Sequence, residues 1–142
     1  MTKKKSNSYE MVEAKRYLFL ETGKRPASFV TDNPVDIPSL GGENISDDGF
    51  LRFDNIRYVS KDYFNGISKG IIRSEDILIN KDGANTGKLA FVQKFPFNDA
   101  MINEHLFIIR STEEFNQKYL FYFLLSQKGQ NQIKSKVVGS AQ

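Results

Sequence analysis

Residues 70–92, GIIRSEDILINKDGANTGKLAFV, are the stretch that best predicts the fold. Two apolar runs, residues 76–80 and 89–92, flank the loop KDGANTG. Short β-branched and apolar runs separated by such a loop are typical of a β-hairpin. Gly83 and Gly87 can adopt a positive φ and let the backbone approach a ligand closely. The loop is therefore either a solvated turn or a presenter of hydrogen-bond donors to an anion.

The composition is that of an ordinary globular domain. The chain has 142 residues, of which 39% are hydrophobic and 26% charged, enough for one domain with a single core. It has no cysteine and one histidine, His105, which excludes disulfides, thiol nucleophiles and zinc sites rich in Cys or His. No apolar run approaches the roughly 18 residues that span a bilayer, and no signal peptide is evident. We therefore expect a cytoplasmic protein.

The charge is mildly basic and unevenly distributed. The net charge is +3. Residues 1–25 carry seven Lys or Arg against three Asp or Glu, residues 26–60 two against six, and residues 61–142 eleven against eight. Such a pattern permits a basic face for nucleic acid without requiring one.

The segments before the hairpin predict a helix followed by irregular structure. Residues 1–12 are polar and expected to be disordered. Residues 13–22, EAKRYLFLET, contain good helix formers and are followed by Gly23 and Pro26, which end helices. Short strands are predicted at 35–37 and 55–59 and a structured loop at 40–46. Residues 61–68 form either one helical turn or a loop.

The C-terminal third predicts a strand and two helices. Residues 106–109 are continuously apolar, as in a strand buried on both faces. Ser111 and Glu114 match a capping box before a helix over 115–125, and Gly129 separates it from a second helix over 131–138. The helical spacing directs some side chains to the core (Tyr119, Leu120, Phe123, Leu124, Ile133, Val137) and others outward or to a neighbour (Phe121, Tyr122, Lys134, Lys136).

Together these elements predict an α+β fold: an irregular, mainly antiparallel β-sheet, a short N-terminal helix and a C-terminal helical pair.

Several catalytic patterns fail on their spacing. In GANTGK, three residues separate Gly83 from Gly87, and Leu89 follows Lys88; a P-loop needs four residues between its glycines and a hydroxyl after the lysine. DNPV at 32–35 lacks the second proline and the aromatic residue of an amino-methyltransferase site. The E-x-K at 13–15 lacks the further carboxylates that two-metal cutting needs. His105 is best interpreted as a hydrogen-bonded structural residue. A binding module remains.

Four phrases along the chain resemble the target recognition domain of a Type I restriction-modification specificity subunit. They are the strand phrase Glu75-Asp76-Ile77-Leu78-Ile79 with Gly83 and Gly87; Asn103-Glu104-His105; Leu125-Ser126 at a helix end; and Gly139-Ser140-Ala141-Gln142. The early Gly23-Lys24-Arg25-Pro26 resembles the family's "G-x-x-P" turn. Their order and spacing cover residues 13–142.

The resemblance implies a non-catalytic host-defence role. The domain would read one half of a split double-stranded DNA target without a cofactor of its own, while partner methyltransferase and restriction subunits bring S-adenosylmethionine, methylation and cleavage. Family members usually carry two such domains, each followed by a long helix. We therefore expect 13–142 to be a single recognition domain, either excised or a half-subunit.

In such a domain, Lys and Arg fix the register on phosphates, while amide and guanidinium groups read base edges. The expected phosphate contacts are Lys24, Arg25, Lys81, Lys88, Lys134 and Lys136, with the backbone amides of Gly87 and Gly139. The expected base readers are Asn44, Arg52, Arg57, Asn85 and Thr86. For each, the alternative is a solvated surface side chain.

Two other functions stay open. The aromatic helix over 119–125 has more large apolar residues than one face needs, which would suit a protein-interaction domain that docks a partner. A nuclease or methyltransferase fragment has little support in the sequence.

Overall fold

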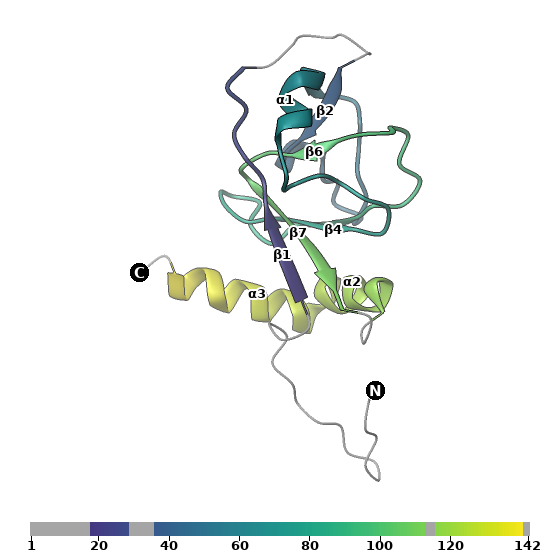
Figure 1. The fold of residues 1–142 in the computed structure, drawn as a ribbon. Coiled ribbons are helices and arrows are strands. Elements are labelled where there is room, and N and C mark those ends of the chain that lie inside the picture. Colours follow the sequence, from purple (N-terminus) through teal and green to yellow (C-terminus); the bar gives the residue numbers. More distant parts are fainter. Residues whose placement is uncertain (1–17, 29–35, 113–115, 141–142) are drawn as a thin grey trace.

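The computed structural model describes residues 18–28, 36–112 and 116–140, with side chains as far as Lys134. These residues form two β-sheets and three α-helices (Figure 1). The larger sheet is antiparallel, in the order β1-β7-β4-β5: β1 (Leu18–Thr22), β7 (Leu106–Ser111), β4 (Ile77–Asn80) and β5 (Leu89–Phe91). The smaller sheet has the order β3-β2-β6: β3 (Arg57–Val59), β2 (Ile37–Leu40) and β6 (Met101–Ile102), with β2 and β6 parallel.

The predicted hairpin is confirmed. β4 and β5 pair antiparallel, with Ile77 opposite Phe91 and Ile79 opposite Leu89. The other long edge of β4 pairs with β7, the strand predicted at 106–109. Strand pairing on both sides of β4 places the hairpin at the centre of the fold.

The larger sheet is covered on both faces, which explains the unbroken apolar runs of its strands. Ile77 and Ile79 of β4 pack on one side with Phe121. Leu78, between them, packs on the other side with Leu40 and Ile102 of the smaller sheet. This alternation follows from the two-residue period of a strand.

The helices lie on opposite sides of the larger sheet. α2 (Gln117–Leu125) and α3 (Gln127–Ser140) lie on one side, and the smaller sheet and α1 (Lys61–Gly66) on the other (Figure 1). Phe64 of α1 packs with Ile37, Val59 and Met101. A short 3₁₀ turn, η2 (Gly42–Asn44), follows β2. None of the helices in the described ranges is both long and apolar enough to span a membrane.

The α+β class, the mainly antiparallel sheet and the C-terminal helical pair are confirmed, but the N-terminal helix is wrong for residues 18–22. These residues form β1, whose register runs from Leu18 opposite Ser111 to Thr22 opposite Phe107. Strand pairing along the whole of β1 outweighs the modest helix propensity of LFLET. Residues 1–17, the DNPV turn at 32–35 and Glu114 lie outside the described residues.

The predicted helix after β7 exists, but its start and one of its faces were predicted wrongly. α2 begins at Gln117 and is capped by Asn116, whose side chain accepts a hydrogen bond from the Tyr119 N–H at 2.9 Å. Ser111 is the last residue of β7. Phe121 is buried at 2% exposure, whereas Tyr119 is 69% exposed. α2 therefore turns Phe121 toward the sheet, because it packs on Phe91 of β5 at a ring-centroid distance of 5.3 Å.

The break between α2 and α3 occurs at Ser126, and the prediction of a break at Gly129 is wrong. Gly129 lies in the first turns of α3 and is buried. A Cβ at this position would collide with the carbonyl oxygen of Phe123 and lie 2.7 Å from Leu124 Cα. Glycine is needed there because the two helices approach closely. Ile133 packs inward and Lys134 is exposed, as predicted.

Candidate nucleic-acid interface

Three connecting segments of the chain meet at one end of the larger sheet. Thr22, the last residue of β1, lies opposite Phe107 near the start of β7. Asn80, the last residue of β4, lies opposite Leu106, and Ile79 lies opposite Leu89, the first residue of β5. Because the strands are antiparallel, the segments 23–25, 81–88 and 103–105 all leave the sheet at this end. We call these three segments, together with the neighbouring Arg52 and Arg57, the loop end.

The 81–88 loop is held by its own hydrogen bonds and by α3. Gly83 and Gly87 have φ values of 77° and 95°, which confirms the expected positive φ. Thr86 Oγ1 donates to the Gly83 carbonyl at 2.6 Å. Gln130 Nε2 of α3 donates to the Gly87 carbonyl at 3.3 Å. The Gly87 N–H donates to the Asn80 carbonyl at 2.7 Å, so this amide is not available to a phosphate, whereas Asn85 is exposed.

Lys88 is placed at the loop end but already has a partner. Its Nζ lies 2.8 Å from Asp47 Oδ1. The hydrogen bond and charge of Lys88 lower the pKa of the Asp47 carboxyl below its ordinary value. The Asp47 carboxylate remains charged at neutral pH, and the pair breaks only in acid, when the pH falls through the lowered pKa of Asp47. A phosphate would have to replace Asp47.

Arg25 and the turn over 103–105 line a small pocket. Arg25 Nε lies 3.0 Å from Glu104 Oε2. His105 Nδ1 lies 2.8 Å from Asp82 Oδ1, which ties this turn to the 81–88 loop. The prediction of a hydrogen-bonded histidine is confirmed. The pocket has a volume of about 200 Å³ and is lined by Arg25, Glu43, Arg57, Asn103, Glu104 and His105.

Two predicted base readers, Arg52 and Arg57, lie beside this pocket, whereas Asn44 does not reach the surface. Arg52 is exposed and its Nε donates to the Glu43 carbonyl at 2.9 Å. Arg57 is exposed at the start of β3 and lines the pocket. Asn44 is fully buried at 0% exposure.

The role predicted for Asn44 is wrong, because its side chain is used inside the fold. Its Oδ1 accepts from the Gly41 N–H at 3.0 Å, and its Nδ2 donates to the carbonyls of Arg52 and Asn55 at 3.2 and 3.0 Å. Buried amides are satisfied in this way when they hold a loop together. Asn44 supports the segment that presents Arg52.

The remaining predicted contacts are divided between the loop end and α3. Lys24 is exposed after β1. Lys81 Nζ lies 4.8 Å from the centre of the Phe107 ring, a cation–π distance. Lys134 is exposed on α3, one residue after Ile133, whose Cγ2 would lie 3.4 Å from a Cβ at Gly87. Lys136 and Gly139 fall in α3 beyond Lys134, outside the residues whose side chains are described.

A buried ionic network stabilises the opposite end of the sheet. Arg110 donates to both Asp76 oxygens, from Nε at 2.7 Å and from one terminal nitrogen at 2.8 Å. The other terminal nitrogen donates to Glu21 at 2.7 Å. The hydrogen bond to Asp76 raises the pKa of Arg110, against the opposing effect of burial. Because the pKa of an arginine is already far above neutral, this group stays charged throughout the ordinary pH range.

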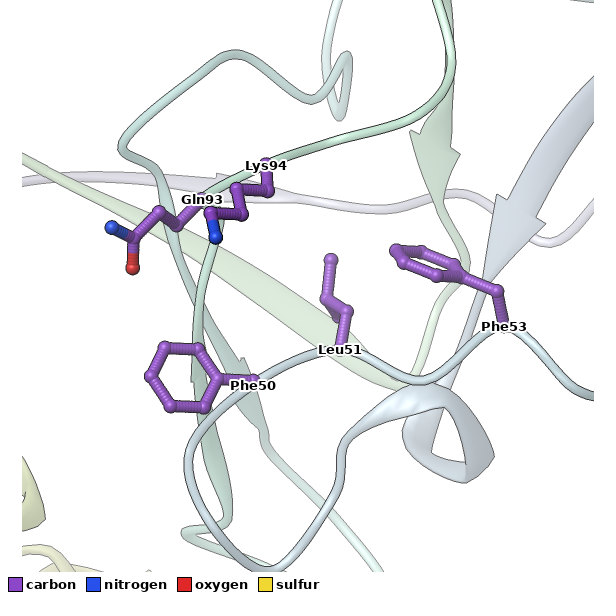
Figure 2. A pocket seen from close by; sticks show the side chains of 5 residues that line it. All are labelled: Phe50, Leu51, Phe53, Gln93 and Lys94. Atoms are coloured by element: carbon purple, nitrogen blue, oxygen red, sulfur yellow. The ribbon is translucent and has the colours of Figure 1, made fainter.

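A second hollow, with both apolar and polar lining residues, lies away from the loop end. Its volume is about 350 Å³. Figure 2 shows Phe50, Leu51 and Phe53 on one side, and Gln93 and Lys94 on the other. Gln93 and Lys94 follow the end of β5, whereas the 81–88 loop precedes its start. In the described ranges, no three acidic or histidine side chains are grouped as a metal ion would require.

A domain that gathers basic and amide side chains on loops at one end of a rigid sheet has the character of a nucleic-acid-binding module. Residues 8–142 match the family described as the Type I restriction modification DNA specificity domain. The chain belongs to this family. Among curated proteins, none matches it.

Two solved structures have a similar fold. One comes from work on complex assembly and conformational transition of the type I R-M system, with a TM-score of 0.60 and 17% identity over 80% of this chain. The other is the HsdS subunit from Thermoanaerobacter tengcongensis, with a TM-score of 0.59 and 15% identity over 90% of this chain. This chain spans 26% and 38% of those two chains.

Two residues of the phrases that carried the family resemblance, Asp76 and Asn103, are parts of the scaffold. Asp76 pairs with Arg110. The backbone carbonyl oxygen of Asn103 lies where a Cβ at Gly23 would have to be placed. The side-chain nitrogen Nδ2 of Asn103 lies where a Cβ at Gly41 would have to be placed. These residues hold the strands together.

Sequence reasoning gave no DNA role to Glu43, Asp82, Asn103, Glu104 or His105. The phrase Asn103-Glu104-His105 could have indicated three of these residues. It stands directly before β7, at the end of the sheet where Glu104 contacts Arg25.

Proposed function

We propose that this chain is a non-catalytic DNA recognition domain that reads one half of a bipartite double-stranded target. The observation that carries the proposal is the loop end, where Lys24, Arg25, Lys88 and Arg57 come from three separate segments. Membership of the DNA specificity family supports the same function. Methylation and cleavage would belong to methyltransferase and restriction subunits of a Type I complex in the cytoplasm, with residues 13–142 as one recognition domain.

The ion pairs at the loop end are compatible with DNA binding because one member of each pair is strongly exposed. The Arg25 side chain is 82% exposed in its pair with Glu104. Exposed ion pairs contribute only about 0–1 kcal/mol. Replacing the carboxylate partner of such a cation by a DNA phosphate therefore costs little free energy. Each new phosphate contact also releases counterions from the DNA.

Within this interface, Lys24, Arg25, Lys81, Lys88 and Lys134 are proposed to contact phosphates, and Arg52, Arg57, Asn85 and Thr86 to contact base edges. Lys136, through its side chain, and Gly139, through its backbone amide, are retained as proposed phosphate contacts. Gly87 and Asn44 contribute by holding their loops, since their polar groups are bonded within the chain.

The salt dependence of binding tests the loop end. Lys88→Ala is expected to weaken binding to all duplexes alike and to reduce the slope of log affinity against log salt by about 1. Lys118→Ala is the matched control. This exposed lysine lies on α2, which packs on Phe91 at the end of β5 that is away from the 81–88 loop. Equal slopes for wild type and Lys88→Ala would remove the 81–88 loop from the contact surface.

A second function is favoured by a specific feature of α2. Tyr122 is 54% exposed and Tyr119 is also exposed, beside Leu125 at the helix end, which would suit docking of a partner protein. The burial of Phe121 removes one residue expected to take part. The double variant Tyr119→Ser, Tyr122→Ser would lose assembly with methyltransferase subunits, with its DNA binding unchanged, if α2 docks them.

A further inference from the structure

The pocket beside Arg25 is lined entirely by polar and charged side chains. Two are guanidinium groups, Arg25 and Arg57, and two are carboxylates, Glu43 and Glu104. The other two are Asn103 and His105. Donors and acceptors therefore lie side by side in a space of about 200 Å³.

The turn over residues 103–105, which carries the carboxylate of Glu104, is held firmly in place. The Asn103 N–H donates to the Leu40 carbonyl at 2.8 Å, and the His105 N–H donates to Asn103 Oδ1 at 2.9 Å. The Asp82 carboxylate holds the His105 ring from the other side. Reading a base requires side chains held in a fixed position, and Glu104 lies between two such anchors.

Arg25 and Glu104 form an adjacent donor and acceptor. Their contact of 3.0 Å uses the Nε of Arg25. The Glu104 side chain is 28% exposed and lies deeper than that of Arg25. A guanidinium has five N–H donors and a carboxylate accepts several hydrogen bonds, so both keep capacity for a ligand.

The charges decide what kind of ligand fits. A phosphate would be attracted by Arg25 and Arg57 but repelled by Glu43 and Glu104. A G·C base pair presents the opposite pattern in the major groove: guanine offers two acceptors, N7 and O6, and cytosine offers the N4 amino donor. Arginine pairs with the first and a carboxylate with the second. The pocket has no apolar side chain to contact the methyl group of thymine.

We infer that this pocket reads a G·C base pair in the DNA target, with Arg25 donating to guanine and Glu104 accepting from cytosine. The inference rests on the proposed function and assigns Arg25 to a base in place of a phosphate. Asp82 and Asn103 are positioning residues, which act through the turn that holds Glu104.

The test is a selection of bound duplexes from a random DNA library. It is made once with the full chain by itself and once with the chain placed within a complete specificity subunit. The wild type should yield a half-site with a G·C pair at a position that responds to the pocket. Glu104→Gln should lose about tenfold or more of the preference for G·C at that position and shift it toward A·T, because an amide suits adenine. Arg25→Ala should lose the preference for guanine there.

The matched control is Glu75→Gln, an exposed glutamate before β4 at the opposite end of the sheet, and its half-site should equal that of wild type. Thermal unfolding of each variant shows that it remains folded. A half-site unchanged in both pocket variants, or weakened equally for all sequences, would overturn the inference and leave the proposed function intact. A wild-type chain that selects no sequence at all would overturn both.

Discussion

Arg110 joins three separate segments of the chain. Its guanidinium contacts Asp76 before β4 and Glu21 in β1, and it donates to the Ile71 carbonyl at 2.8 Å. Asp76 is buried at 2% exposure and also accepts from the Arg73 N–H at 2.8 Å. Removing one partner of a buried pair leaves the other charge uncompensated.

Asp76→Asn is therefore expected to lower the free energy of unfolding by about 3 kcal/mol, measured by urea denaturation. Asp54→Asn serves as the control, because Asp54 is exposed and its carboxylate lies 4.0 Å from Arg52 Nε. This substitution should change stability by no more than about 0.5 kcal/mol. Equal losses of unfolding free energy for the two substitutions would show that the Arg110 network does not stabilise the fold.

If Lys88 contacts a phosphate as proposed, Asp47 competes with DNA for it. Asp47→Asn removes a negative charge from the loop end and leaves Lys88 without its carboxylate partner, 2.8 Å away in this structure. Because ion pairs at the surface contribute little, affinity for any duplex should rise by no more than about fivefold, in a fluorescence anisotropy titration at fixed salt. Combination with Lys88→Ala should abolish most of this gain. A gain that persists without Lys88 would contradict the proposed competition.

The elements show which structural features can be predicted from sequence. The β4–β5 hairpin follows from two apolar runs around KDGANTG, a signal contained within about 20 residues, and its prediction was right. β1 was missed because its stability comes from β7, with Glu21 opposite Ile108 far along the chain. No local pattern encodes that pairing.

The candidate site was only partly predictable for the same reason. Cations such as Lys88 and Arg57 could be chosen from residue type and position in the chain. The carboxylates Glu43 and Glu104 could not be chosen, because their role depends on which strands share an end. Asn44 was misassigned because an amide in a glycine-rich loop looks identical in sequence whether it faces solvent or bonds to the backbone at Arg52 and Asn55.

The close approach of α2 and α3 makes a direct test of the helical pair. Gly129→Ala would push a methyl group against the backbone of Phe123 and Leu124. Overpacking of this kind costs typically 1–3 kcal/mol, seen as a lower midpoint in urea. Gly66→Ala is the control, because a Cβ at Gly66 in α1 meets nothing within 4 Å. A stable Gly129→Ala variant would mean that the two helices are packed less closely than described.

The molecule as a whole separates scaffold from contact surface. The buried Arg110 network and the helical pair stabilise the sheet, while the loops at its other end carry exposed donors and acceptors. Substitutions at the loop end should therefore alter DNA binding with little loss of stability.

The most direct measurement grafts this domain in place of a recognition domain of a complete specificity subunit with its methyltransferase partners, and selects bound duplexes from a random library. We expect a short, reproducible half-site that moves with the graft, next to the unchanged half-site of the host subunit. Normal assembly and DNA binding without any new sequence preference would contradict the central claim that this chain reads DNA, and would favour partner docking through α2.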